Sequence, residues 1–213
     1  SGFKLTPRTV SWSRDGGLLA VGMDGREGPS RIHVFETATW KRVFDDRDVI
    51  GRVDAIEFRR DGVFFATTNN GRIDSEVFLY RPAETSYTRV ARKSLGRKSA
   101  FRAAWATDET HLYVGGHSRL GGDDLSVLAW PDSGGRPPAA EGFSVMRESP
   151  DGGRVYAAFR GGNAETGKLR RYDDWSLRAY DEIVVADGRV ADLAVLRGGQ
   201  VVYVSQDGAV AAI

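Results

Sequence analysis

The chain has 213 residues, 41% of them hydrophobic and 28% charged, a balance that is typical of a globular domain and argues against disorder. With 30 Lys and Arg against 29 Asp and Glu, the formal net charge is +1, which provides no overall field to attract nucleic acid or an anionic membrane. The absence of cysteine excludes disulfides and Cys-based zinc sites and fits a cytoplasmic location, and no apolar run is long enough to span a bilayer.

A short unit recurs along the chain: an apolar strand, a tight turn, a second apolar strand, a polar loop and a third strand. The first strand with its turn occupies residues 9–16, 53–62, 101–108, 143–152 and 190–199. The turns are anchored, at spacings of 46, 47, 43 and 47 residues, on Asp15, Asp61, Asp108, Asp151 and Gly198. An apolar residue stands five positions before each anchor, and a second stands three before in four copies, so both lie on one face of a strand. Asp-Gly favours the left-handed turn that closes a hairpin.

The remaining strands follow in the same order in each repeat. The second strand is predicted at residues 18–21, 63–66, 112–114, 155–158 and 201–204. The third strand is predicted to end at Phe35, Tyr80, Trp130, Tyr172 and Ile213, and a fourth is clearest at residues 40–44 and 176–180. Because helical periodicity is absent, the sequence predicts an all-β protein.

Four short strands at a period in the low-to-mid forties are typical of propeller blades. The Ser-Pro-Asp-Gly segment at residues 149–152, the Asp-Gly turns, and Trp130 and Tyr172 near the usual Trp-Asp position resemble WD40 repeats of a degenerate, bacterial type. The resemblance implies a β-propeller of about five four-stranded antiparallel blades in a single domain. The blades are expected at about residues 6–46, 47–95, 96–141, 142–184, and 185–213 together with 1–5.

Two features of the repeats differ from the usual WD40 pattern: the residue pair before the first strand, and the last repeat. The family's Gly-His pair is replaced by Gly-Arg, at Arg52, Arg97 and Arg189, so the buried His–Asp–Trp network cannot form in its usual way. The fifth repeat lacks an outer strand, and residues 2–5 offer a spare one. The resemblance implies that this N-terminal strand completes the last blade and closes a monomeric ring, which would also protect an unpaired edge. Further blades outside the chain, or a second chain, are the alternatives.

A binding rim is predicted from the loops between second and third strands. These loops, at residues 24–30, 69–76, 117–124 and 160–167, are long, and in a resembling propeller they share one rim with the segments leading into each blade. Arginine is a good ligand for carboxylates and phosphates. The candidate partner-binding residues on this rim are Arg26, Arg52, Arg72, Ile73, Arg97, His117, Arg119, Leu120, Arg160 and Arg189.

The same loops also carry acidic residues, which leaves a second interpretation open. These are Asp24, Glu27, Asp74, Glu76, Asp123, Asp124 and Glu165. They could pair with the arginines and hold the long hairpins in place, although exposed pairs contribute little each. The rim is therefore expected to be either a binding surface for an acidic or phosphorylated segment or a ring of structural ion pairs.

No catalytic set is visible in the sequence. His33 is expected to be structural within a third strand, and His111 is expected to contact its turn at Asp108. Only His117 then remains, and one histidine is too few for a histidine metal site. Phosphate-loop, nucleophile-elbow and zinc-protease motifs are absent. No catalytic residue, metal or cofactor is therefore predicted.

Glu148 is the one anomalous carboxylate, because it stands at a strand position that is apolar in other repeats. A buried, unpaired carboxylate is costly, so we expect a local partner such as Arg147 or Arg154, or a slip in strand register.

These features favour a non-catalytic interaction, sensor or scaffold module that binds a peptide or partner domain and belongs to a larger multidomain protein. The alternative is a small-ligand or glycan-binding, lectin-like propeller, in which Trp40 or Trp175 would stack on a sugar.

Overall fold

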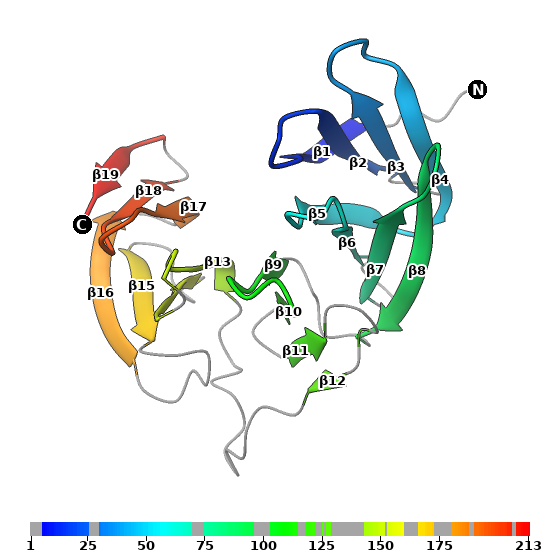
Figure 1. The fold of residues 1–213 in the computed structure, drawn as a ribbon. Helices are drawn as coiled ribbons and strands as arrows, with labels where there is room; N and C mark the ends of the chain where they lie inside the picture. Colours follow the sequence, from blue (N-terminus) through cyan, green and yellow to red (C-terminus); the bar gives the residue numbers. More distant parts are fainter. Residues whose placement is uncertain are drawn as a thin grey trace. The chain divides into compact units, whose positions relative to one another are not determined.

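The computed structural model describes residues 6–25, 30–69, 75–95, 103–114, 118–121, 125, 127–128, 143–151, 153–159, 166–172, 180–187, 190–205 and 208–213. All regular elements in these ranges are β-strands (Figure 1). They form four four-stranded sheets and one three-stranded sheet, and the strands of each sheet are consecutive along the chain. The architecture is all-β, as the sequence predicts.

The strands are numbered in chain order. The first sheet contains β1 (Thr6–Trp12), β2 (Leu18–Asp24), β3 (Ser30–Glu36) and β4 (Arg42–Val49). The second contains β5 (Arg52–Phe58), β6 (Phe64–Asn69), β7 (Ser75–Pro82) and β8 (Tyr87–Ser94). The third contains β9 (Ala103–Trp105), β10 (His111–Val114), β11 (Ser118–Gly121) and β12 (Val127–Leu128). The fourth contains β13 (Phe143–Glu148), β14 (Val155–Phe159), β15 (Thr166–Tyr172) and β16 (Tyr180–Asp187), and the fifth β17 (Val190–Val195), β18 (Val201–Ser205) and β19 (Val210–Ala212).

The chain divides into two compact bodies. The first comprises residues 1–103 and 121–126 and holds the first and second sheets. The second comprises residues 104–120 and 127–213 and holds the fourth and fifth sheets with most of the third.

The repeated turns have one geometry. In the first four repeats, the carboxylate of the anchoring aspartate accepts a hydrogen bond from the backbone N–H two residues later. The distances are 3.0, 3.2, 2.8 and 3.1 Å for Asp15, Asp61, Asp108 and Asp151. In the first and fourth repeats a serine two residues before the aspartate donates to the same carboxylate, at 2.6 and 2.5 Å. The predicted anchors are therefore confirmed, because a short side chain that accepts from its own turn fixes the hairpin.

Two predicted strand positions are wrong. In the third repeat, residues 117–124 were expected to form a loop, but β11 lies there and β12 pairs with it as the fourth strand, Arg119 opposite Leu128. In the fourth repeat the outer strand begins at Tyr180 and continues to Asp187, rather than occupying residues 176–180. Short segments of this kind take their conformation from cross-strand pairing, which local composition does not encode.

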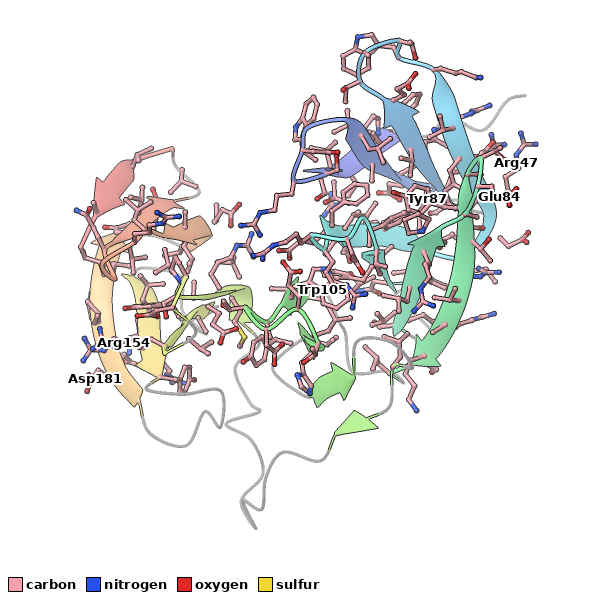
Figure 2. The ribbon with its side chains drawn as sticks, in the orientation of Figure 1. Arg47, Glu84, Tyr87, Trp105, Arg154 and Asp181 are labelled. Carbon is pink, nitrogen blue, oxygen red and sulfur yellow. The ribbon has the colours of Figure 1, made fainter. Side chains whose placement is uncertain are left out.

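The core of the first body lies between its two sheets. Ile32 and Val34 of β3 are fully buried against residues of the second sheet such as Ile56, Phe64 and Tyr80. The rings of Phe64 and Tyr80 stack, with centroids 4.6 Å apart. Figure 2 shows the Tyr87 ring among the side chains of the first body, where its hydroxyl donates to the Gly62 carbonyl at 3.1 Å. Burial of this aromatic cluster supplies the main driving force for packing the sheets.

Polar contacts also join the first two sheets. The hydroxyl of Tyr80 donates to the buried Asp46 carboxylate at 2.9 Å, and Arg89 approaches the same carboxylate at 3.5 Å. Burial and the neighbouring Asp46 charge raise the pKa of Tyr80, so the hydroxyl stays protonated and remains a donor. The Ser86 hydroxyl donates to the Val43 carbonyl at 2.8 Å. These bonds fix the register of one sheet against the next.

The second body repeats this arrangement. One apolar cluster contains Tyr113, Met146 and Tyr172, and another contains Val145, Tyr156 and Leu193. Each cluster draws residues from two successive sheets, so each sheet is covered by its neighbour.

Glu148 has a partner that the sequence did not indicate. Its carboxylate accepts the backbone N–H of Thr107 at 2.5 Å, and the Thr107 hydroxyl donates to the Ser149 carbonyl at 3.1 Å. Arg147, one of the expected partners, donates instead to the Met146 carbonyl and to Asp192. Glu148 therefore joins the third and fourth sheets through the backbone N–H of Thr107.

One face of the first sheet differs from its counterparts. The residue five positions before the turn anchor is 3–7% exposed in the second to fifth repeats, where it is Ile56, Ala103, Met146 and Leu193. In the first repeat it is Val10, which is 56% exposed. Trp12, on the same face of β1, is also exposed. Among the described residues, no strand precedes β1 to cover this face.

Candidate functional site

The antiparallel order gives each sheet two distinct ends. We call the end that carries the second-to-third loop and the segment leading into the first strand the loop end, and the opposite end the turn end. In the first sheet Thr6, Asp24 and Ser30 lie at the loop end, because β1 and β3 begin there and β2 ends there. Arg52 and Asn69 are directly paired at the loop end of the second sheet. In the first and second sheets, the second-to-third loop and the segment leading into the first strand therefore lie at the same end of the sheet.

Arg52 is the one predicted rim residue whose side chain the structure describes. Its Nε and Nη2 donate to the two oxygens of Asp54 at 2.6 and 3.0 Å. The hydrogen bond with Asp54 raises the pKa of Arg52, and the charge of Asp24 adds to it. This bidentate pair supports the structural interpretation of Arg52, since the carboxylate already occupies the guanidinium fork.

Two neighbours of Arg52 were not among the predicted residues. Arg8, at the start of β1, approaches Asp54 through Nε at 3.6 Å and its side chain is 45% exposed. Ile50, in the segment that leads into β5, is 57% exposed. No sequence motif marks either residue, because their position near Arg52 depends on which strands lie side by side in the fold. Together with Arg52 they place basic and apolar groups at the loop end of the first body.

The other predicted rim residues are distributed as follows. Arg119 and Leu120 lie within strand β11, paired with β12, so the expectation that they occupy a loop tip is wrong. The remainder lie outside the described residues: Arg26, Arg72, Ile73, Arg97, His117, Arg160 and Arg189.

The described histidines have the structural roles expected of them. His33 lies within β3, with its Nε2 3.3 Å from the Asp45 carboxylate. The Nδ1 of His111 is 2.9 Å from the carboxylate of Asp108, the anchor of its own turn. In the part of the chain that the structure describes, no three His, Asp or Glu side chains are grouped as metal ligands would be. Nor does any described segment form a helix long and apolar enough to cross a membrane.

Comparisons with known proteins place the fold. No protein-family model matches the chain, and a comparison with curated proteins finds no match. Among solved structures the chain is similar to the β-propeller domain of Cps50 (Swd1) from Myceliophteria_thermophila, with 15% identity and a TM-score of 0.68 over 97% of this chain and 64% of that one. It is similar to the Dos1 propeller, with 10% identity and a TM-score of 0.70 over 98% and 55% of the two chains.

A third similar structure is an enzyme. The chain matches hydrazine synthase from Kuenenia stuttgartiensis with 15% identity and a TM-score of 0.70, over 92% of this chain and 55% of that one. The chain therefore spans 55–64% of the length of these three structures.

The protein has the fold of a WD40-like β-propeller, as the repeats in its sequence indicate. Propellers of similar shape include both scaffolds and enzymes, so function must be argued from the surface of this chain.

Proposed function

We propose that the chain is a non-catalytic interaction module that binds an acidic or phosphorylated segment of a protein partner at its loop end. The observation that carries the proposal is the group formed by Arg8, Arg52 and Ile50 in the first body. The sequence-predicted arginines Arg72 and Arg119 are proposed to contribute further basic groups for the same partner.

The geometry around Asp54 suits such a partner. Arg52 holds the carboxylate with two short hydrogen bonds, whereas Arg8 reaches it only at 3.6 Å. Arg8 can therefore move to an incoming carboxylate or phosphate without leaving Asp54 unpaired. The exposed Ile50, two residues before Arg52, provides an apolar side chain at the same end of the sheet. Charged groups together with an apolar anchor are typical of binding hot spots.

Peptide-array binding tests this function. An array of acidic and phosphoserine peptides should retain the wild-type protein and retain Arg8→Glu or the pair Arg72→Glu and Arg119→Glu at least about tenfold more weakly, as loss of a charge-assisted contact implies. Arg197→Glu, an exposed arginine in the turn between β17 and β18, is the matched control and should bind as wild type. Unchanged binding by both Arg8→Glu and the Arg72→Glu/Arg119→Glu double variant would exclude these residues as the binding site. Binding to a glycan array instead would favour the lectin-like alternative.

We further propose that the module is a ring of five blades, at about residues 6–46, 47–95, 96–141, 142–184, and 185–213 with 1–5, closed by the N-terminal segment. Two observations support it: the uncovered position of Val10, and the fifth sheet, which has three strands among the described residues where the others have four. Solution scattering that fits an open arc or a dimer would contradict closure.

A further inference from the structure

The turn between β3 and β4 holds a tryptophan in an unusual conformation. It lies at the turn end of the first sheet, between β3 and β4 (Figure 1), whereas Arg8 and Ile50 belong to the loop end. Trp40 is 62% exposed and has a φ of 55°, in the left-handed region. That region brings the Cβ atom close to backbone oxygen, so glycine and asparagine adopt it far more easily than a bulky residue. An indole that is mostly exposed gains little burial to offset this strain. The fold therefore does not explain a tryptophan here.

The turn is held in place by hydrogen bonds. The Glu36 N–H donates to the Lys41 carbonyl at 2.9 Å and closes the hairpin. Thr37 joins it to the adjacent turn, because its N–H donates to the Gly17 carbonyl at 3.0 Å and its hydroxyl to the Gly16 carbonyl at 2.8 Å. The indole is consequently presented on a fixed backbone, which lowers the entropy that a partner's binding would cost.

The charges around this turn leave a basic group available. The Asp15 carboxylate accepts hydrogen bonds within its own turn, and the Glu36 carboxylate accepts one from the Thr39 hydroxyl at 2.5 Å. The exposed Lys41 side chain has no ion-pair partner among the residues that the structure describes. Arg42, next along the chain, approaches the carboxylate of Asp45 at 3.7 Å. An ammonium group that forms no ion pair with the described residues thus stands directly after the exposed indole.

We propose that Trp40 and Lys41 form a second docking site, for an acidic peptide segment that carries an apolar side chain. The indole packs against the apolar side chain, and the ammonium group pairs with a neighbouring carboxylate. Residual backbone strain at an exposed aromatic is a feature of functional sites, and tryptophan is among the residues that dominate interface energies. The site lies at the opposite end of the sheet from the proposed loop-end surface and does not depend on it.

A bead-displayed library of random octapeptides tests the chemistry of the ligand. The wild-type protein should enrich peptides that combine carboxylates with an apolar residue, and Trp40→Asn should not. With an enriched peptide, Trp40→Asn should weaken binding about 30-fold or more, the loss expected for a tryptophan hot spot, and Lys41→Glu should also weaken it. Val184→Ala removes an exposed apolar side chain of β16 and should leave binding unchanged.

Thermal unfolding separates a docking role from a structural one. Asparagine tolerates the left-handed conformation, so Trp40→Asn should keep or raise the melting temperature, by roughly 2–4 °C, while binding is lost. A lower melting temperature would show that the tryptophan supports the fold and would overturn the proposal. Enrichment of basic peptides, enrichment that survives Trp40→Asn, no enrichment at all, or Trp40-dependent binding to glycans would each overturn it as well.

Discussion

The aspartate at each first-to-second turn makes the same backbone contact, but its other partner changes from repeat to repeat. It is a serine hydroxyl for Asp15 and Asp151, a guanidinium for Asp61 and an imidazole for Asp108. Hydrogen bonds from these serines lower the pKa of Asp15 and Asp151, and the bond from Arg59 lowers that of Asp61. The turn therefore tolerates divergence in its neighbours as long as one short acceptor is kept.

His33 provides a pH dependence that can be measured. Burial of its ring lowers the pKa of His33 below its usual value of 6.5, and the opposing charge of Asp45 does not restore it. In the window below about pH 6.5, the unfolded chain binds a proton that the folded chain does not, so protons favour unfolding. The stability that neutral His33 contributes is fully present above this window and is lost as the pH falls through it.

We expect the free energy of unfolding, measured by denaturant titration, to fall as the pH is lowered from about 7.5 to 5. His33→Gln, which does not titrate, should flatten this dependence. The aspartates with lowered pKa titrate below 3.8, outside the window, and do not confound it. Equal pH dependence in the variant and the wild type would refute the role of His33.

At the scale of the element, the first two sheets approach closely at one glycine. A Cβ atom on Gly22 of β2 would lie 2.4 Å from Cγ1 of Val53 and 2.8 Å from the Thr9 methyl carbon. Both neighbours are β-branched and have little rotamer freedom to move away. The absence of a side chain here is what lets β2 and β5 pack, so the glycine acts through close approach rather than through backbone conformation.

Gly22→Ala should therefore destabilise the protein by about 1–3 kcal/mol, the usual cost of overpacking a core, and lower the melting temperature by several degrees. Gly17→Ala is the matched control, since its Cβ would meet nothing closer than 3.4 Å and should have a much smaller effect. Adding Val53→Ala to Gly22→Ala should recover part of the loss. If the changes in unfolding free energy of the two single variants simply add in the double variant, residues 22 and 53 do not clash.

Strands with a clear period of two could be predicted from the sequence, and those without it could not. The first strands of the first and second repeats could be predicted directly, because Trp12 and Phe58 alternate with polar neighbours. In β11 the glycines and the Asp123-Asp124 pair that follow resemble a loop, and only pairing with β12 makes Ser118–Gly121 a strand. Cross-strand pairing is a non-local property, so local patterns do not reveal it.

At the scale of the whole molecule, β19 is a strand with a neighbour on only one side among the described residues. This strand pairs with β18 on one side, and its residues are exposed. If residues 1–5 supply its second neighbour, deleting them should speed hydrogen exchange of the β18 and β19 amides by about tenfold or more and leave β5–β8 unchanged. Replacing the same five residues with a Gly-Ser segment separates loss of side chains from loss of chain length.

Unaltered exchange in both variants would contradict N-terminal closure. Faster exchange throughout the chain would show a general loss of stability instead of the loss of one strand.

The candidate site could be predicted only in part. Arg52 stands in the Gly-Arg pair of the repeat pattern and is found by comparing repeats. Arg8 and Ile50 become visible only when β1 and β5 are side by side, because neither occupies a repeated position. The sequence marks Trp40 only as an aromatic that could stack on a ligand, whereas its left-handed φ and its exposure come from the three-dimensional structure.

The consecutive strand order described for every sheet has a consequence for synthesis of the chain. The described strands of each sheet come from about forty consecutive residues, so they can pair soon after those residues have left the ribosome. Contacts that are local in sequence form quickly, so blades can assemble in turn while translation continues. The one pairing that joins the two termini, if it forms, has to wait for the last residue. That step would then be the slowest, and the nascent chain would carry an uncovered Val10 face until it is complete.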